Sequence, residues 1–436
     1  MQTGAESPVR WQRYLGLNRS TASLLAAIAL ITCGTELWSP VLPKVIDRLG
    51  GTILLIAAYG AFRDLLEAVN YFVGGAVAGR LNTRRGLLLF NVLPLGGLML
   101  LLLWRSPYAA LVALPFVFVW DSVAGPATLS VIGQTLDPAH RTMAFSLQAL
   151  SRRVSRFLAY TASAAVLWIV GRAAADDGAT LLRGFDINVA IGIVAVLMAM
   201  LLQWRFMRSA HADSATVIHR PLRTLRAFDP QLKRLLAADI LARLAEGMPR
   251  ELIILYTIAV IDRPVHVGAA IHASLLLNIQ VVVNILLYLL IGPLASRAGL
   301  AKKPFIGLTF VFFAAFPMAL AVFGPMWGLA GLCLAYGVGG MREIGEPARK
   351  AMVTELVVAE TRTQAIGIYW GVRSAAVCLA PLAGGALWLT GEALRTGAGP
   401  YCMLAGASLC GWTGALFFYI RFGRITPPQR HPTAKG

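Results

Sequence analysis

Ionisable side chains interrupt the long apolar segments of this chain, and their spacing limits the chemistry that they could do. Asp239, Arg243, Glu246 and Arg250 follow one another at intervals of four, three and four residues, so in a helix all four lie along one face. A carboxylate between two arginines stays ionised, but it can bind a proton if the arginines move away. The pattern indicates either a site for a proton or a charged solute, or a static ladder of ion pairs.

A second charged stretch reads Arg-Glu-Ile-Gly-Glu-Pro-Ala-Arg-Lys over residues 342–350. Glu343 and Glu346 are three residues apart and share a helix face. Pro347 lacks a backbone donor and so leaves a helix carbonyl without its partner. The stretch is interpreted either as a gate or coupling element, or as the end of a helix with basic anchors.

Three arginines form a further group, because Arg152 and Arg156 lie one helical turn apart and Arg373 lies at an equivalent depth of another apolar segment. They could hold the anionic group of a solute. Alternatively, they could pair with Asp64 and Glu67, which also share a helix face.

Three more charged residues lie inside apolar segments. Arg63 comes four residues before Glu67, and this spacing, with Asp64 three residues before Glu67, favours local and interhelical pairing. Glu36 and Asp121 each lack such a neighbour, so each is either a coupling site or part of hydrogen-bonded packing.

The elements that carry these residues must be membrane helices. The chain has 436 residues, of which 57% are hydrophobic and 14% charged, whereas soluble domains average roughly 45–50% and about 25%. A helix that crosses a bilayer needs about 20 apolar residues. The sequence predicts an all-α membrane protein with twelve spans, which begin near Ser20, Thr52, Leu87, Tyr108, Met143, Ile187, Leu235, Gly268, Phe305, Met326, Thr363 and Pro400.

The charged residues of these spans follow a period of three. The third, sixth, ninth and twelfth spans carry none, and neither does the eighth, which has Asn278, Gln280 and Asn284. An ionised group at the centre of a bilayer costs roughly 2.5–3.5 kcal/mol on insertion scales, so it should face protein or water. We expect the uncharged helices at the periphery and the others around a polar interior.

The net charge of +18 is explained by topology. An even number of spans places both termini on one side, and the excess of Lys and Arg gathers there, which identifies that side as cytoplasmic. Nucleic-acid binding is not needed to account for the charge.

The chain also divides into similar halves. The run Val-Ile-Asp-Arg at 45–48 recurs at 260–263, and Glu36 corresponds to Glu251 at the same offset of 215. We expect a six-helix bundle at 1–204, a cytoplasmic linker at 205–234 and a second six-helix bundle at 235–436. Such a duplication is typical of secondary transporters, whose site lies between the halves.

No motif favours an enzyme, a metal site or a cofactor. The five cysteines lie within predicted spans without a Cys-x-x-Cys pair. His266 and His272 have no acid or thiol spaced for ligation. We therefore expect no catalytic residues, no metal and no cofactor.

The loop after the second predicted span, with Gly75, Gly79, Arg80, Arg84 and Arg85, resembles the cytoplasmic signature of the major facilitator superfamily in its glycine and its basic cluster. Alternatively, its arginines simply anchor the loop at the cytoplasmic surface. The acidic position of that signature holds Gly79 here. The resemblance extends over nearly the whole chain and implies a bacterial inner-membrane transporter. It also implies that helices 1, 4, 7 and 10 line a central cavity.

These patterns predict a secondary transporter that moves a small polar or charged solute by alternating access, coupled to protons. We expect a monomer in the lipid bilayer with both termini in the cytoplasm. The alternatives are a broad-specificity exporter of the multidrug type and, from another class, a membrane sensor or lipid-processing protein.

Overall fold

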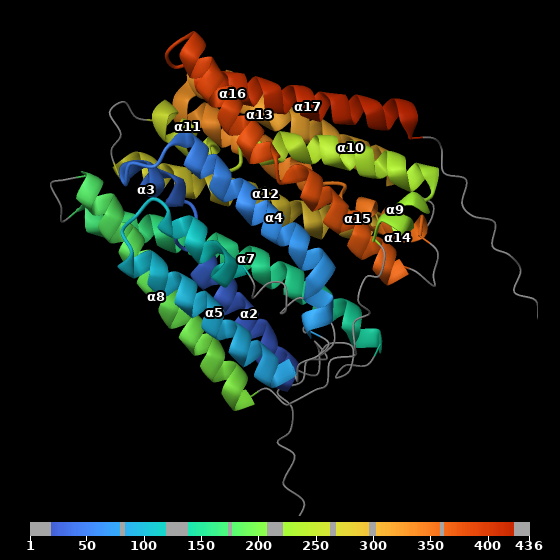
Figure 1. Cartoon of the computed structure of the whole chain (residues 1–436), viewed down its shortest axis with the longest axis horizontal. Coiled ribbons are helices and arrows are strands. Elements are labelled where there is room, and N and C mark those ends of the chain that lie inside the picture. The colour runs from blue at the N-terminus through green and yellow to red at the C-terminus, as the bar shows by residue number, and fades with distance from the viewer. Residues whose placement is uncertain are drawn as a thin grey trace, which may run out of the picture.

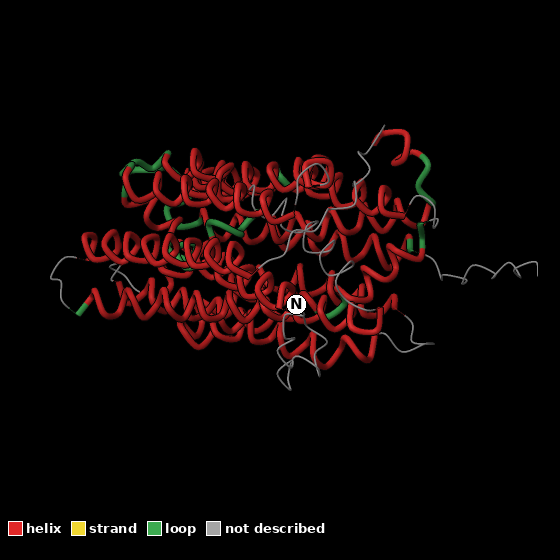
Figure 2. The backbone as a smooth tube through the Cα atoms, turned by 90° about the horizontal axis from the view of Figure 1, so that it is seen from below, coloured by secondary structure: helices red, strands yellow, loops and turns green. Residues whose placement is uncertain are grey.

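The computed structural model describes residues 19–78, 83–118, 138–172, 177–206, 221–261, 267–295, 302–357 and 362–422. These residues are almost entirely helical and form no strand (Figure 2). The prediction of an all-α protein is therefore confirmed.

The first set of helices precedes residue 207 and the second set follows residue 220. The first set consists of α2 (Arg19–Glu36), α3 (Leu42–Arg48), α4 (Ile53–Ala78), α5 (Thr83–Leu103), the helical segment Ala109–Phe118, α7 (Pro138–Gly171) and α8 (Asp177–Phe206). The second set consists of α9 (Pro221–Arg226), α10 (Pro230–Gly247), α11 (Ile253–Ile261), α12 (Val267–Ala295), α13 (Lys302–Gly340), the 3-10 turn η1 (Met341–Glu343), α14 (Glu346–Glu355), α15 (Arg362–Val377), α16 (Ala380–Leu394) and α17 (Gly399–Arg421).

Six helical segments among the described residues are long and apolar enough to cross a membrane. They are Leu150–Gly171, Gly178–Phe206, Gly268–Leu287, Lys302–Glu355, Ala365–Leu394 and Gly399–Arg421. Large apolar side chains lie exposed on them, for example Leu158 and Leu409 at 54% and 68%. Such surfaces need lipid rather than water as their neighbour. The chain is a multi-pass membrane protein.

Proline and glycine break several of the helices. α10 ends at Gly247 and α11 begins at Ile253, because Pro249 between them cannot donate a helix hydrogen bond. α13 runs through the predicted ninth and tenth spans and bends at Gly328, whose φ of 54° and ψ of −127° suit only glycine. α13 thus consists of two helices that meet at this non-helical residue, and they cover the two spans expected there.

Close packing within each set depends on small residues. In the first set α2 packs on α8, and a Cβ added to Gly192 would lie 2.6 Å from the carbonyl oxygen of Gly34. In the second set α13 and α10 both pack on α17. Backbones that approach this closely exclude any side chain at the crossing.

The two sets meet along a few helices. α4 contacts α15 and α16, α7 contacts α12, and α3 contacts α11. We call the end of the molecule with α3 and α11 the closed end, and the end where α2 begins and α17 finishes the terminal end. Figure 1 shows the two sets close together at the closed end and diverging towards the terminal end.

Candidate functional site

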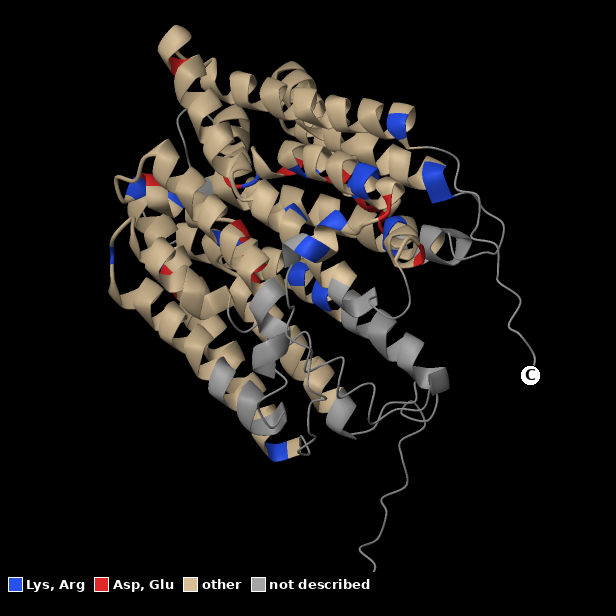
Figure 3. Ribbon diagram, turned by 45° about the vertical axis from the view of Figure 1, so that its right-hand side comes forward, with Lys and Arg blue, Asp and Glu red and all other residues tan. Residues whose placement is uncertain are grey.

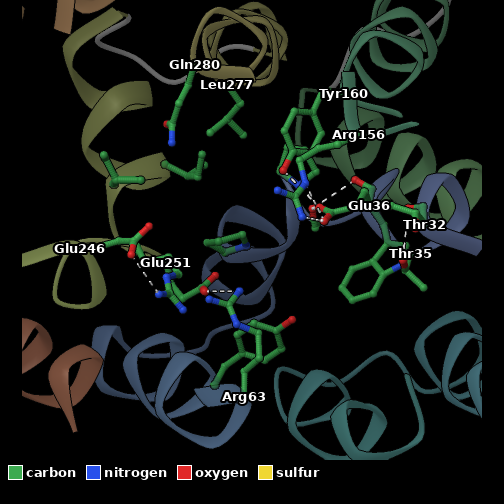
Figure 4. Close-up of a pocket in the computed structure, with 18 of the residues that line it drawn as sticks. Thr32, Thr35, Glu36, Arg63, Arg156, Tyr160, Glu246, Glu251, Leu277 and Gln280 are labelled. Atoms are coloured by element: carbon green, nitrogen blue, oxygen red, sulfur yellow. Dashed lines mark hydrogen bonds and ion pairs between the residues drawn. The ribbon is translucent and has the colours of Figure 1, made fainter. Parts of the chain in front are cut away.

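A cavity of about 450 Å³ lies between the two sets of helices, within the size range of small-molecule sites. Its lining residues come from α2, α3, α4, the segment Ala109–Phe118 and α7 of the first set, and from α10, α11, α12, α13 and η1 of the second set. We call it the central cavity. Figure 4 shows its polar side chains facing one another from both sets, with the amide of Gln280 directed into the space.

The described lining is rich in charge. It includes five arginines and four glutamates, namely Arg63, Arg152, Arg156, Arg250 and Arg342 with Glu36, Glu67, Glu246 and Glu251. In Figure 3 many of the Lys, Arg, Asp and Glu residues gather along the boundary between the sets. Because burial in hydrocarbon penalises unpaired charge, each group should have a partner.

On the first-set wall, Glu36 is the acceptor for three side chains. Arg156 donates to it at 2.7 Å, and the hydroxyls of Tyr160 and Ser39 each donate at 3.1 Å. Arg156 thus pairs with Glu36, and the arginines that contact Asp64 are Arg250 and Arg63. The physical reason is that α7 packs against α2, so Arg156 reaches the carboxylate of that helix.

Two adjacent ion pairs join the first set to the second. Arg63 contacts Glu251 at 2.7 Å, and Arg250 contacts Asp64 at 2.5 Å. Arg63 also lies 3.7 Å from Asp64. We call these four residues the inter-set quartet. Of the local and interhelical pairing expected for Arg63, the structure shows an interhelical pair with Glu251 and a local contact with Asp64.

Glu67 itself faces the space between the sets. It accepts a hydrogen bond from the hydroxyl of Tyr71 at 3.3 Å. Arg152, which was predicted to pair with it or to hold an anion, also lines the central cavity.

Glu246 lies at the junction of three arginines. Arg243 donates to it at 2.6 Å, while Arg342 and Arg250 approach to 3.5 and 3.8 Å. α10 ends one residue after Glu246, at Gly247, and this carboxylate lies at the wall of the central cavity. The sequence predicted this carboxylate between Arg243 and Arg250, and both arginines lie near it. The structure shows a third arginine beside it, Arg342 of η1.

A second charge cluster, which Arg243 links to Glu246, lies towards the terminal end of the second set. Arg349, only 1% exposed, donates to both Asp239 and Glu346. Tyr369 donates to Asp239 at 3.1 Å, and Arg373 approaches Asp239 to 3.8 Å. Sequence reasoning treated Arg349 as a basic anchor at a helix end. The available signal was its position three residues after Glu346, on the same helix face.

Further polar contacts cross between the sets. Arg153 of α7 contacts Glu343 of η1 at 3.2 Å, and Asn278 of α12 donates to Thr161 of α7 at 2.9 Å. Sequence reasoning did not predict either pair, because the helix orientations that bring them together depend on tertiary packing.

The remaining predicted residues lie partly outside the described chain. Asp121, Gly79 and Arg80 are outside the described residues. Gly75 lies in α4, and Arg84 and Arg85 lie in the first turn of α5. Within the described residues, no group of three or more side chains suited to a metal ion comes together.

Comparison with solved structures shows the fold. A mutant of the nucleoside transporter NupG matches with a TM-score of 0.73 and 16% sequence identity, covering 92% of this chain and 100% of that one. A mutant of the peptide transporter POT matches with a TM-score of 0.69 and 14% identity, covering 95% and 98%. A POT family transporter in complex with 5-aminolevulinic acid matches with a TM-score of 0.70 and 12% identity, covering 93% and 96%.

Comparison of the sequence gives no match. No protein-family model matches the chain, and no curated protein does so either. The similarity is therefore one of fold, preserved at low sequence identity.

Proposed function

We propose that this chain, which has the fold of the major facilitator superfamily transporters, is a secondary transporter of a small polar or charged solute. The proposal rests chiefly on the central cavity, which is lined by charged residues from both sets of helices. Each of these nine ionisable side chains adds a desolvation cost when it is placed in the membrane interior. Their presence around an open space therefore favours a binding role over a purely structural one.

The twelve-span layout is part of the proposal. In the first set, α2 with α3, α4, α5, the segment from Ala109, α7 and α8 would make six crossings. In the second set, α10 with α11, α12, the two arms of α13, α15 with α16, and α17 would make six more. Residues 1–204 and 235–436 would then form the two bundles, joined by the linker at 205–234.

Alternating access would work by rocking one bundle against the other. The inter-set quartet and the contact of α3 with α11 hold the closed end together. When these contacts break and the terminal end closes, the central cavity would open to the other side. The ion pairs that bridge the sets are therefore the elements that must exchange partners.

Proton coupling has Glu246 as its leading candidate. Three arginines surround this carboxylate, and two of them also contact other acids, since Arg250 pairs with Asp64 and Arg243 approaches Glu346. Movement of the bundles would change the carboxylate with which each arginine forms an ion pair. A carboxylate that loses its arginines in a low-dielectric site favours the protonated form.

A charged solute suits the cavity better than a lipophilic one. Its arginines and glutamates offer donors and acceptors for a carboxylate, a phosphate or an amine. A broad-specificity exporter, the predicted alternative, would rely mainly on apolar and aromatic walls. We propose further that the protein is a monomer of the bacterial inner membrane, that it has no catalytic role, and that the terminal end faces the cytoplasm.

The test is a flux assay with the purified protein in lipid vesicles. A panel of amino acids, short peptides, nucleosides and organic anions is supplied outside, with and without an imposed pH gradient. We expect uptake of at least one charged solute, accelerated by the gradient and lost in Arg156→Gln. Uptake that is indifferent to the gradient would remove proton coupling, and no uptake of any solute would count against transport.

A further inference from the structure

A second cavity, of about 400 Å³, lies on the terminal side of the central cavity. Its lining residues are Tyr71, Arg243, Glu346, Lys350, Val353, Thr354, Ile366, Trp370 and Arg373. None of them belongs to the lining of the central cavity. The wall is built by α10, α14 and α15 of the second set, and Tyr71 of α4 faces it from the first set.

The lining of this second cavity is strongly cationic. It contains Arg243, Lys350 and Arg373 but one carboxylate, that of Glu346. This carboxylate already accepts from Arg349 beneath it, and Arg243 and Lys350 approach it to 3.4 and 3.5 Å. Glu346 thus contacts three cations, of which Arg243 also donates to Glu246. The lining itself has three cations and one carboxylate and so carries an excess of positive charge.

Arg373 carries most of that excess. Its side chain is 11% exposed, and its guanidinium stacks over the ring of Trp370 at 4.3 Å. Among the described residues it donates no hydrogen bond, since its nearest carboxylate oxygen, on Asp239, lies 3.8 Å away. That oxygen already accepts from Arg349 and Tyr369.

No described acceptor lies within hydrogen-bond distance of this guanidinium. In the low dielectric of a cavity, a charge-assisted hydrogen bond to it is stronger than in water. Stacking on an aromatic ring satisfies the flat face of the group but leaves the N–H edges available. Those edges are the part of arginine that binds carboxylates and phosphates in a bidentate manner.

We propose that the second cavity binds an anionic group of the carboxylate or phosphate class, held by Arg373 with Lys350 and Arg243. Tyr71 lies across the cavity, where its hydroxyl is bonded to Glu67. An anion bound here would thus touch the second set and face the first. Two sources could supply it, a soluble anion or the headgroup of an anionic lipid. The proposal does not depend on transport.

Binding is tested at equilibrium with inorganic phosphate as the probe. The full-length protein is placed in nanodiscs of neutral phosphatidylcholine and titrated by calorimetry. We expect the dissociation constant to rise at least about tenfold in Arg373→Gln, as for the loss of a charge-assisted bond, and about three- to tenfold in Lys350→Gln. Lys302→Gln, which removes a cation outside both cavities, should bind as the wild type does.

Arg373→Gln changes a buried residue and could disturb folding. Lys350→Gln then still tests the site, because the Lys350 side chain is 59% exposed. Phosphate binding that is unchanged in both Arg373→Gln and Lys350→Gln would overturn the proposal.

A second arm distinguishes the two sources. In nanodiscs of phosphatidylglycerol, a lipid occupant would weaken phosphate binding to the wild type but not to Arg373→Gln. Unchanged binding in that lipid would identify a soluble anion. If phosphate does not bind in the neutral lipid, and phosphatidylglycerol stabilises wild type and Arg373→Gln equally against heat, the site does not exist.

Discussion

The inter-set quartet gives the sharpest test of how the two sets are held together. Arg63→Gln removes the counterion of Glu251, whose side chain is 10% exposed. Removing one partner of a buried ion pair costs about 3–5 kcal/mol. Arg63 is 21% exposed, and the second pair of the quartet stays in place. We therefore expect Arg63→Gln to remove about 1–3 kcal/mol of the free energy that holds the two sets together at the closed end. A change of this size would shift the equilibrium between the closed and the open arrangement of that end by about 5–150-fold.

The assay is a double-mutant cycle on thermal unfolding in lipid nanodiscs. Arg63→Glu and Glu251→Arg should each lower the unfolding midpoint, because each places like charges together. The combined reversal restores opposite charges and should recover part of the loss, with a coupling energy of at least about 1 kcal/mol.

Lys44→Gln is the matched control for this cycle. It breaks a pair of 2.6 Å with Asp47 inside α3, where the partner is 39% exposed. Its lysine is 13% exposed, but a pair three residues apart on one helix is worth only about 0.2–0.5 kcal/mol. The reasoning is refuted if the two reversals add without coupling, or if the control costs as much as Arg63→Gln.

Two further predictions concern coupling and packing. Glu246→Gln should abolish the acceleration of uptake by a pH gradient, while solute exchange between the two sides continues. The control Glu355→Gln, at an exposed carboxylate, should keep the acceleration. A gradient effect that is retained in Glu246→Gln would assign the coupling role to another residue. Gly192→Val should lower thermal stability by about 1–3 kcal/mol, since even a Cβ there would meet the carbonyl oxygen of Gly34. Gly96→Ala, whose Cβ meets nothing within 4 Å, should leave unfolding by heat nearly unchanged, and equal effects of the two substitutions would contradict the packing argument.

The helical fold could be predicted from the sequence because long apolar segments have one stable arrangement in a bilayer, the helix. The convergence of charge was also predictable from energetics, since ionised groups avoid lipid. The sixth span shows the limit. It was expected to begin near Ile187, but α8 begins at Asp177. Asp186 lies inside that helix, paired with Arg105. The helix therefore includes a paired acid that lies outside the expected span.

The partners of individual charges could not be predicted. Spacing along one helix identifies neighbours on that helix, so it suggested Glu67 as a local neighbour of Arg63 but did not identify a partner on another helix. The observed partner, Glu251, is far along the chain and depends on how α4 meets the start of α11. Arg349 shows the same limit, because nothing in its sequence position reveals that α10 and α14 bury it against Asp239.

The most direct test of the account measures distances at both ends of the molecule at once. Spin labels are attached in a background without the five native cysteines. One pair, Leu54→Cys with Leu394→Cys, spans the sets at the closed end, and another, Trp204→Cys with Ile420→Cys, spans them at the terminal end. Alternating access predicts that a transported solute or a change of pH lengthens one distance and shortens the other. Two distances that stay fixed, or that change together, would contradict it.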